Sequence, residues 1–233
     1  MTPDGRPPAP PATPAETPRL LVASANLGKR REIHAILDEI LEERIELVGL
    51  DSLGADPAFS EEGDSFDANA RAKALHYHKV HRLPAIADDS GLVVDALDGE
   101  PGVRSSRYLG EETAYAAKMA DIVRRLEEAG VPEAERSARF TCALAVAAAG
   151  RVIACIVKNV FGRIAPEPRG SGGFGYDPIF YCTELSATFG EASQQEKDRV
   201  SHRAQALRAL AVLLRNHAAL RRELGFKAGG SSS

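Results

Sequence analysis

Residues 84–110 read PAIADDSGLVVDALDGEPGVRSSRYLG, and the rest of the chain is organised around them. The apolar runs at 85–87 and 92–94 are each typical of a buried strand. Between them lies the segment 88–91, DDSG, with two adjacent carboxylates. Because Asp is depleted in strand interiors and Asp, Ser and Gly favour turns, the pattern predicts a strand, an acidic turn and a second strand.

The carboxylate pair of Asp88 and Asp89 allows two interpretations. Neighbouring carboxylates repel each other unless a cation, water or hydrogen-bond donors offset their charge. At a strand end the pair suits a divalent ion such as Mg²⁺, which takes oxygen ligands and keeps waters for a phosphate-bearing substrate. The same segment also suits a plain solvated turn. On this stretch alone both interpretations stay open.

Composition is typical of a soluble globular protein and excludes several other classes. The chain has 233 residues, 44% hydrophobic and 27% charged, which is enough for one large α/β domain. A net charge of -4 argues against a protein that coats nucleic acid, and no apolar run is long enough to span a bilayer. Cys142, Cys155 and Cys182 have no CxxC partner, which indicates reduced thiols and a cytoplasmic location.

The chain divides by composition into an arm, a folded body and a tail. Residues 1–18 are rich in Pro, Ala and Thr and are expected to be disordered, and residues 227–233 are expected to be a flexible tail. The body, 19–226, is expected to be a single domain. Its strands alternate with helices and include a hairpin around Gly150, which predicts an α/β fold with a mixed sheet.

The loop 24–29, SANLGK, is a candidate anion site. It follows a buried strand at 19–23 and opens a helix predicted from near Lys29 to Glu43. Free backbone N–H groups and the helix dipole point at such a loop, and Lys29 adds a positive charge. The loop lacks the GxxxxGK[ST] pattern, and its residues also suit a plain helix cap.

Two further segments suit a ligand. In a helix predicted over 65–80, Asn69 and Lys73 stand four residues apart on one face, so Lys73 can reach a cleft. The segment 170–178, GSGGFGYDP, interleaves four glycines with two aromatic residues. Glycines let the backbone approach a ligand closely, and an aromatic ring offers a flat face to a base. This predicts a binding loop.

A long helix is predicted over 203–224, with Ser201 as its N-cap. His202 and Arg203 then stand as hydrogen-bond donors at the positive end of the helix dipole. They are suited to bind a hydrogen-bond acceptor or an anion. The alternative is that they are part of the helix cap and bind no ligand.

Four segments in this order resemble the ITPase-like pyrophosphatases of non-standard purine nucleoside triphosphates, the dITP/XTP pyrophosphatases. The segments are SANLGK (24–29) with Glu32, FDANARAK (66–73), ADDSGL (87–92) through Arg107-Tyr108, and GGFGYDP (172–178) with SHRA (201–204). The resemblance spans nearly the whole body, from Leu20 to about Arg215. It implies an elongated, two-lobed α/β fold with a mixed sheet and the active site in the cleft between the lobes, a homodimer, and Mg²⁺ dependence.

The resemblance also implies a reaction and the residues that perform it. The reaction is hydrolysis between the α- and β-phosphates, giving monophosphate and pyrophosphate, which keeps deaminated purines out of DNA and RNA. Asp89 is implied as the general base and as a metal ligand, with Glu61 as the second metal ligand and Glu62 as the alternative in another register. The implied substrate contacts are Ser24, Ala25, Asn26, Leu27, Gly28, Lys29, Lys73, Ser90, Phe174, Gly175, Tyr176, Asp177, Lys197, His202 and Arg203.

Base selection has a physical basis in this set. Inosine and xanthosine present an oxygen acceptor at purine position 6, whereas adenine presents an amino donor. Donors such as Arg203 and His202 satisfy the oxygen, and a buried mismatch with adenine rejects it by roughly 10⁴-fold. Guanine also carries a 6-oxo group, so its 2-amino group has to be refused elsewhere, by the loop ending at Asp177.

Two other functions are weighed against this one. A pyrophosphatase of modified pyrimidine nucleotides, as in the Maf-like group, is disfavoured by the His202-Arg203 pair and the GFGYD loop. A nucleotide-binding sensor without chemistry is disfavoured by the two aspartates and the upstream glutamate pair, because a sensor needs no base for a metal-bound water. Neither nucleic acid nor a membrane is expected as a partner. Arg104 is assigned either to the partner subunit or to the cleft.

Overall fold

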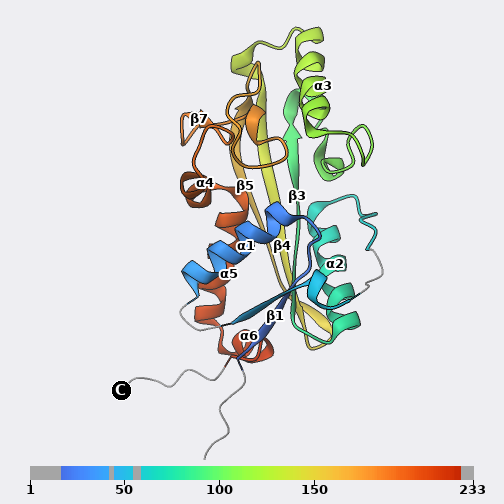
Figure 1. Cartoon of the computed structure of the whole chain (residues 1–233), viewed down its shortest axis with the longest axis vertical. Coiled ribbons are helices and arrows are strands. Elements are labelled where there is room, and N and C mark those ends of the chain that lie inside the picture. The colour runs from blue at the N-terminus through green and yellow to red at the C-terminus, as the bar shows by residue number, and fades with distance from the viewer. Residues whose placement is uncertain (1–16, 42–44, 55–58, 227–233) are drawn as a thin grey trace, which may run out of the picture.

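A computed structural model of the chain describes residues 17–41, 45–54 and 59–226. The protein is elongated, and a seven-stranded sheet runs along its length (Figure 1). The expected arm, 1–18, lies outside the described residues apart from Thr17 and Pro18. The expected tail, 227–233, and the last residues of the first predicted helix also lie outside them.

The sheet is mixed, as predicted. Its strands are β1 (Arg19–Val22), β2 (Glu46–Gly49), β3 (Ala85–Val94), β4 (Ser137–Ala148), β5 (Arg151–Ile164), β6 (Phe180–Cys182) and β7 (Ala187–Thr188). They lie in the order β2-β1-β3-β4-β5-β6-β7. β1 pairs in parallel with β2 and β3, and every later pairing is antiparallel.

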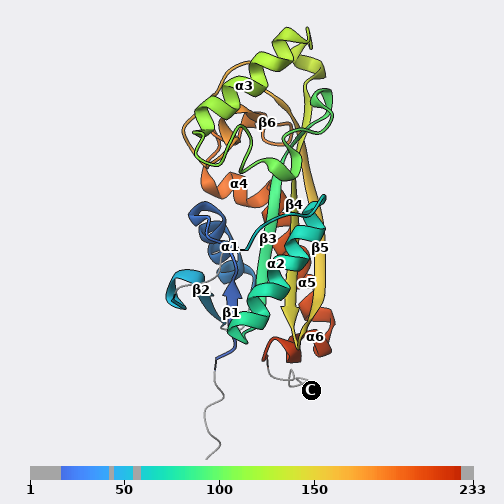
Figure 2. The same cartoon turned by 90° about the vertical axis from the view of Figure 1, so that its right-hand side faces the viewer.

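The hairpin predicted around Gly150 is confirmed and forms the spine of the molecule. Ala148 pairs with Arg151, and the two turn residues, Ala149 and Gly150, have φ angles of 50° and 77°. Positive φ at both turn residues matches the right-handed twist of the strands. β4 runs beside β3, and β5 runs beside β4, along most of the length of the protein (Figure 2).

The acidic segment is not a turn, so this prediction was wrong. Residues 85–94 form one unbroken strand, β3, in which Asp88 pairs with Leu144 and Asp89 with Ala143 of β4. Successive side chains on a strand point to opposite faces of the sheet. The two carboxylates therefore leave the backbone on opposite sides, and this separation limits their repulsion without a turn.

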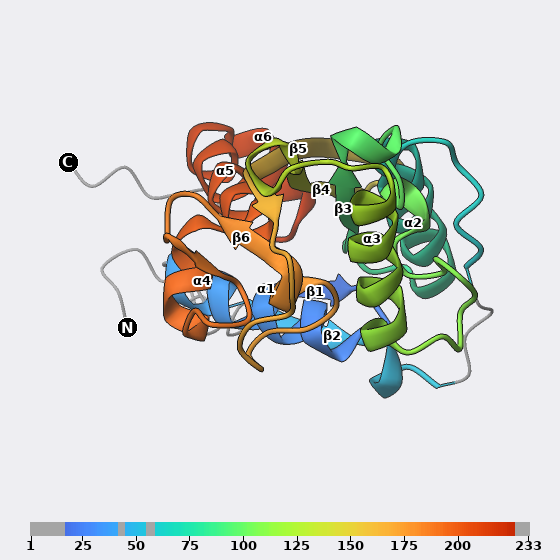
Figure 3. The same ribbon diagram turned by 90° about the horizontal axis from the view of Figure 1, so that it is seen from above.

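Helices cover both faces of the sheet in its lower half. α1 (Leu27–Ile40) and α5 (His202–Asn216) pack on one face, and α2 (Phe66–His81) packs on the other (Figure 3). The first face is lined by larger side chains such as Leu144 and Val146. On the second face Ala70 and Ala74 of α2 meet alanines of β4, so the helix lies close to the sheet.

The upper half has its own core. α3 (Tyr115–Glu128) packs through Met119 and Ile122 against residues such as Phe140 and Phe180. The other helices are α4 (Gln194–Val200) and α6 (Ala218–Glu223), with short 3-10 helices η1 (Leu50–Ser52), η2 (Asp95–Leu97), η3 (Gly102–Arg104), η4 (Glu133–Glu135) and η5 (Asp177–Ile179). No helix in the described part of the chain is long and apolar enough to cross a membrane.

The long C-terminal helix predicted over 203–224 is interrupted. Ser201 is its N-cap, as predicted, because its hydroxyl oxygen accepts from the N–H of Ala204 at 3.2 Å. At His217 the backbone leaves the helical region, with φ -126° and ψ 88°, and α6 follows. The break allows Leu224 and Phe226 to join the core beneath α1 and α5.

We expect Gly91→Ala to destabilise the protein, because a Cβ there would lie 2.6 Å from the Gly102 carbonyl oxygen and would clash with the Ser105 hydroxyl. That hydroxyl accepts from the N–H of Leu92 at 2.9 Å and ties the segment after η3 to β3. Overpacking of this kind costs about 1–3 kcal/mol, measurable as a lower urea midpoint. Val212→Ala, at a side chain 53% exposed, is the control and should change stability by less than about 0.5 kcal/mol. Equal midpoints for wild type and Gly91→Ala would contradict the expectation.

Candidate active site

A cleft opens where the two halves of the molecule meet, over the middle of β3. Its space is about 840 Å³ when the open solvent at its mouth is included. Its lining includes nearly every predicted site residue: Ser24, Ala25, Asn26, Lys29, Glu61, Lys73, Asp89, Ser90, Phe174, Gly175, Tyr176, Asp177, Lys197, His202 and Arg203. Other lining residues are Gly91, Val103, Ser105, Ser106, Tyr115 and Phe140. Segments far apart in the sequence thus meet in one cavity.

Leu27 and Gly28 are the predicted site residues that do not line this cleft. Leu27 is 58% exposed and lies at a separate surface hollow. At Gly28 a Cβ would lie 2.7 Å from the Phe174 ring. Gly28 therefore provides room for that ring to lie against the first loop.

The first loop combines both interpretations offered by its sequence. Asn26 caps α1, because its Oδ1 accepts from the N–H of Lys29 at 3.0 Å. The Ser24 hydroxyl accepts from the N–H of Asn26 at 3.3 Å. The same residues line the cleft beside the positive end of the helix dipole. The cap thus presents the loop to the cavity.

Asp88 and Glu32 hold the cations on the α1/α5 side of the sheet. Lys29 Nζ lies 2.6 Å from Asp88 Oδ1, and Arg203 Nε donates to Asp88 Oδ2 at 3.0 Å. Arg203 also donates to Glu32 through Nη1 and to the Ser90 hydroxyl through Nη2, the latter at 2.8 Å. Arg203 is only 1% exposed, so these partners compensate a buried charge.

The ion pairs continue towards the Gly-rich loop. Lys197 Nζ lies 2.7 Å from Glu32 Oε1 and 2.6 Å from Asp177 Oδ2. Asp177 Oδ2 also accepts from the N–H of Phe174 at 2.7 Å. Opposite charges therefore alternate from Lys29 to Asp177, and they tie α1, β3, α4, α5 and η5 together.

The ionisation states of Asp88 and Glu32 are set by their cationic partners. Burial alone raises the pKa of a carboxyl, but Arg203 and Lys29 hold the pKa of Asp88 well below its usual range. In the same way Arg203 and Lys197 outweigh burial and lower the pKa of Glu32 to about 2. Both groups are ionised at neutral pH. The sequence predicted no ion-pair partner for Asp88 or for Glu32, although Glu32 stands one helical turn after Lys29.

Asp89 meets a different environment on the opposite face of the sheet. Its Oδ2 accepts from Asn69 Nδ2 at 2.9 Å, and Asn69 Oδ1 accepts from the N–H of Gly63 at 2.7 Å. Burial, followed by the negative charge of Glu61, raises the pKa of Asp89 to about 6. A carboxylate with a pKa near the working pH is suited to accept a proton.

The Asp89–Glu61 pair fits Mg²⁺. Within residues 17–41, 45–54 and 59–226, no three His, Cys, Asp or Glu side chains are grouped to hold a metal. One or two protein carboxylates are enough for Mg²⁺ when phosphates and waters complete its shell. Glu61 and Glu62 both line an outer hollow, but only Glu61 also lines the cleft with Asp89, and its charge acts on Asp89. Lys73 Nζ lies 2.6 Å from Glu61 Oε1.

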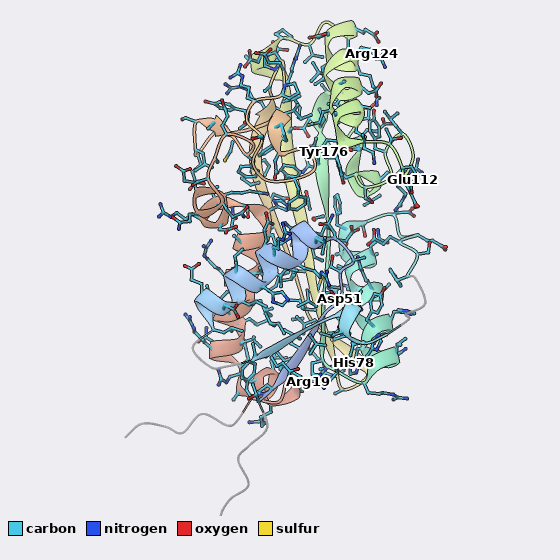
Figure 4. All side chains as sticks on the ribbon, in the orientation of Figure 1. Arg19, Asp51, His78, Glu112, Arg124 and Tyr176 are labelled. Carbon is cyan, nitrogen blue, oxygen red and sulfur yellow. The ribbon has the colours of Figure 1, made fainter. Side chains whose placement is uncertain are left out.

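The upper end of the cleft is aromatic. His202 is 4% exposed and stacks on Phe140, with ring centroids 4.9 Å apart. Burial, followed by the charge of Arg203, lowers the pKa of His202 far enough to keep the ring neutral, and Nδ1 has no hydrogen-bond partner among the described residues. The Phe174 ring lies 4.6 Å from Lys197 Nζ. Tyr176, labelled in Figure 4, donates to the Ser105 carbonyl oxygen at 2.9 Å.

We expect Glu32→Gln to lower the free energy of unfolding by about 3–5 kcal/mol at pH 7, because it breaks a buried ion pair. The pKa of Glu32 falls from its ordinary 4.5 to about 2 on folding, so its contribution is complete above about pH 5. That contribution is lost as the pH falls through 2, and the difference between wild type and variant should shrink accordingly.

Urea unfolding at a series of pH values measures this difference. Glu39→Gln, at an exposed position of the same helix, is the matched control and should have little effect. A difference between wild type and Glu32→Gln that stays constant from pH 7 to pH 2 would rule out the charge as its cause.

Comparison with known proteins agrees with the site. Residues 20–213 match the Ham1 family. A dITP/XTP pyrophosphatase of Geobacillus kaustophilus is 45% identical over 191 residues, covering 82% of this chain and 91% of the relative. One from Geobacter sulfurreducens is 44% identical over 199 residues, covering 85% and 96%. The structure of a HAM1 protein from Coxiella burnetii has a TM-score of 0.75 at 38% identity, covering 86% of this chain and all of that one. The chain belongs to the Ham1 family.

Proposed function

We propose that the chain is a Mg²⁺-dependent nucleoside triphosphate pyrophosphatase that hydrolyses dITP, ITP and XTP to monophosphate and pyrophosphate. In the cell this activity removes deaminated purine nucleotides from the precursor pool. One observation carries the proposal: the Asp89 carboxylate lies in a cleft that also holds Glu61 and three lysines. The relatives named dITP/XTP pyrophosphatase support the choice of substrate.

The triphosphate is assigned to the end of the cleft near α1. Lys29, Lys73 and Lys197 line the cavity, and the N-terminus of α1 adds a partial positive charge. These groups are matched to the several negative charges of a triphosphate. Each lysine is already held by a carboxylate, so its ammonium is positioned before a nucleotide arrives.

Asp89 is assigned as the base that takes a proton from the attacking water. Asn69 fixes Oδ2, which leaves Oδ1 as the acceptor for that proton. Asp89 and Glu61 would hold the Mg²⁺, which when bound neutralises phosphate charge and polarises the phosphoryl group. Attack at the α-phosphate then gives the monophosphate, with pyrophosphate as the leaving group.

The base is assigned to the aromatic end of the cleft. The buried Nδ1 of His202 has no partner in the described structure and is available to a 6-oxo purine. Arg203 lines the same cavity, and its guanidinium lies 5.7 Å from the centre of the Phe174 ring. A 6-amino group in place of the oxygen would leave buried donors unpaired, which is the basis for rejecting ATP.

Release of pyrophosphate tests the proposal directly. ITP, XTP, dITP, GTP, ATP and dTTP are each incubated with the protein and Mg²⁺. We expect fast release from the first three only, with monophosphate as the other product. Orthophosphate would place the attack at the γ-phosphate instead. Cleavage of the pyrimidine nucleotide alone would favour a pyrophosphatase of pyrimidine nucleotides. Nucleotide binding without cleavage of any substrate would favour a sensor.

Asp89→Asn should lower kcat by about 10²–10⁴-fold, because the amide cannot accept the proton. Nucleotide binding, measured by calorimetry, should remain. Asp95→Asn is the control, since Asp95 lies just beyond the end of β3, is 57% exposed and pairs with Arg139 outside the cleft. Near-normal turnover by Asp89→Asn would contradict the assignment of Asp89 as the base.

A homodimer and a cytoplasmic location complete the proposal. The three cysteines are free, which suits a reducing compartment. For the dimer we choose the face of the sheet above α2, where Val157 is 48% and Phe161 67% exposed. Both side chains lie on the same face as Cys155, which packs beneath α2. Exposed large apolar side chains on a regular sheet face suit a second copy.

Phe161→Arg should shift the protein from dimer to monomer, because it places a charge in the proposed apolar interface. Light scattering after size-exclusion chromatography measures the mass. Val212→Arg, which charges an apolar position 53% exposed on α5, should leave the mass unchanged. A monomeric wild type, or a Phe161→Arg protein that remains dimeric, would contradict this interface.

A further inference from the structure

Asp88 has no role in the reaction described so far, yet it contacts cations assigned to both ends of the substrate. Its Oδ1 lies 2.6 Å from Lys29 Nζ, on the phosphate side. Its Oδ2 accepts from Arg203 Nε at 3.0 Å, on the base side. Lys29 comes from α1 and Arg203 from α5, so one carboxylate of β3 joins two helices.

The carboxylate of Asp88 is fully used. In addition to the two cations, Oδ1 accepts from the Ser90 hydroxyl at 2.9 Å and Oδ2 from the Cys142 thiol at 3.0 Å. The side chain is 0% exposed, so water does not replace a partner that moves away. A change in the position of Lys29 is therefore felt by Arg203 through a shared, desolvated anion.

We propose that Asp88 is a positioning residue that couples triphosphate binding at Lys29 to base selection by Arg203. The inference rests on the proposed function. A triphosphate that engages Lys29 fixes the ammonium against Oδ1 of Asp88. The carboxylate is then held in the orientation in which Oδ2 accepts from Arg203, so the guanidinium is fixed for the base. The coupling is reciprocal, because a base that engages Arg203 in turn alters the balance at Lys29.

Lys73 provides a matched comparison within the same cleft. Its ammonium also lies on the phosphate side, but it pairs with Glu61 at 2.6 Å. Lys73 comes from α2, on the face of the sheet opposite the one that Asp88 occupies. Loss of Lys73 therefore removes a phosphate contact and leaves the Lys29–Asp88–Arg203 connection intact.

The test is the ratio of kcat/KM for ITP to that for ATP in wild type, Lys29→Ala and Lys73→Ala. Both nucleotides carry the same triphosphate, so loss of a simple phosphate contact slows both equally and leaves the ratio unchanged. We expect Lys73→Ala to behave in this way. In Lys29→Ala the ratio should fall by roughly 5- to 150-fold, the range of energetic coupling between two sites. An unchanged ratio in Lys29→Ala would overturn the proposal.

Asp88→Asn supplies the second half of the test. Its ratio should already be reduced, and adding Lys29→Ala should lower it no further, because the connection is already broken. Additive losses in the double variant would overturn the proposal. Circular dichroism establishes whether Asp88→Asn folds. If it does not fold, the comparison of Lys29→Ala with Lys73→Ala still decides the question.

Binding separates a failure of this inference from a failure of the proposed function. Dissociation constants of ITP and ATP, measured by calorimetry on the same proteins, give a ratio that does not depend on turnover. Selective binding without pyrophosphate release would refute the enzyme, and the variants would still test the coupling. Equal binding ratios in wild type and Lys29→Ala would refute the coupling, and no binding of either nucleotide would refute both.

Discussion

The alternation of side chains along β3 is the constraint on which the site depends. Asp88 and Asp89 are neighbours in sequence, but the pleat sends one towards α1 and α5 and the other towards α2. Cations hold the pKa of Asp88 well below its usual range, whereas burial and Glu61 raise that of Asp89 to about 6. Two identical residues thus acquire different chemistry from their surroundings. A slip of one residue in the register of β3 against β4 would exchange them.

The buried ion pairs beside Asp88 are better explained by function than by stability. Removing charges from water is costly, and apolar residues of similar volume often stabilise a core as well or better. Here Lys197 and Arg203, which are 2% and 1% exposed, both line the cleft. Their carboxylate partners keep them ordered without shielding them completely from a ligand. The site is therefore preorganised, and the free-energy cost is that of removing these charges from water.

The success of the sequence-based predictions depended on how local the signals were. Ser201 caps its helix as expected, and the hairpin follows from Gly150, because these features are decided by a few adjacent residues. The capping box of Ser193 and Glu196, which starts α4, was equally local and was missed. The acidic turn was wrong because Arg203, which compensates Asp88, lies 115 residues further along the chain. Glu32 and Arg203 are 171 residues apart, so no local pattern reveals their contact.

The continuous strands of the hairpin determine how the cleft can change its width. β4 and β5 have 12 and 14 residues, and β5 at full extension spans about 46 Å, so the same two strands belong to both halves of the molecule. Their ladder of backbone hydrogen bonds crosses the waist with a single register shift, between Val146 and Ala147. The cleft therefore opens or closes by twisting of the paired strands β4 and β5. This twist is distributed over many residues, whereas a hinge would concentrate the motion in a loop. The stiffness of the sheet then limits the substrates that the cleft can accommodate.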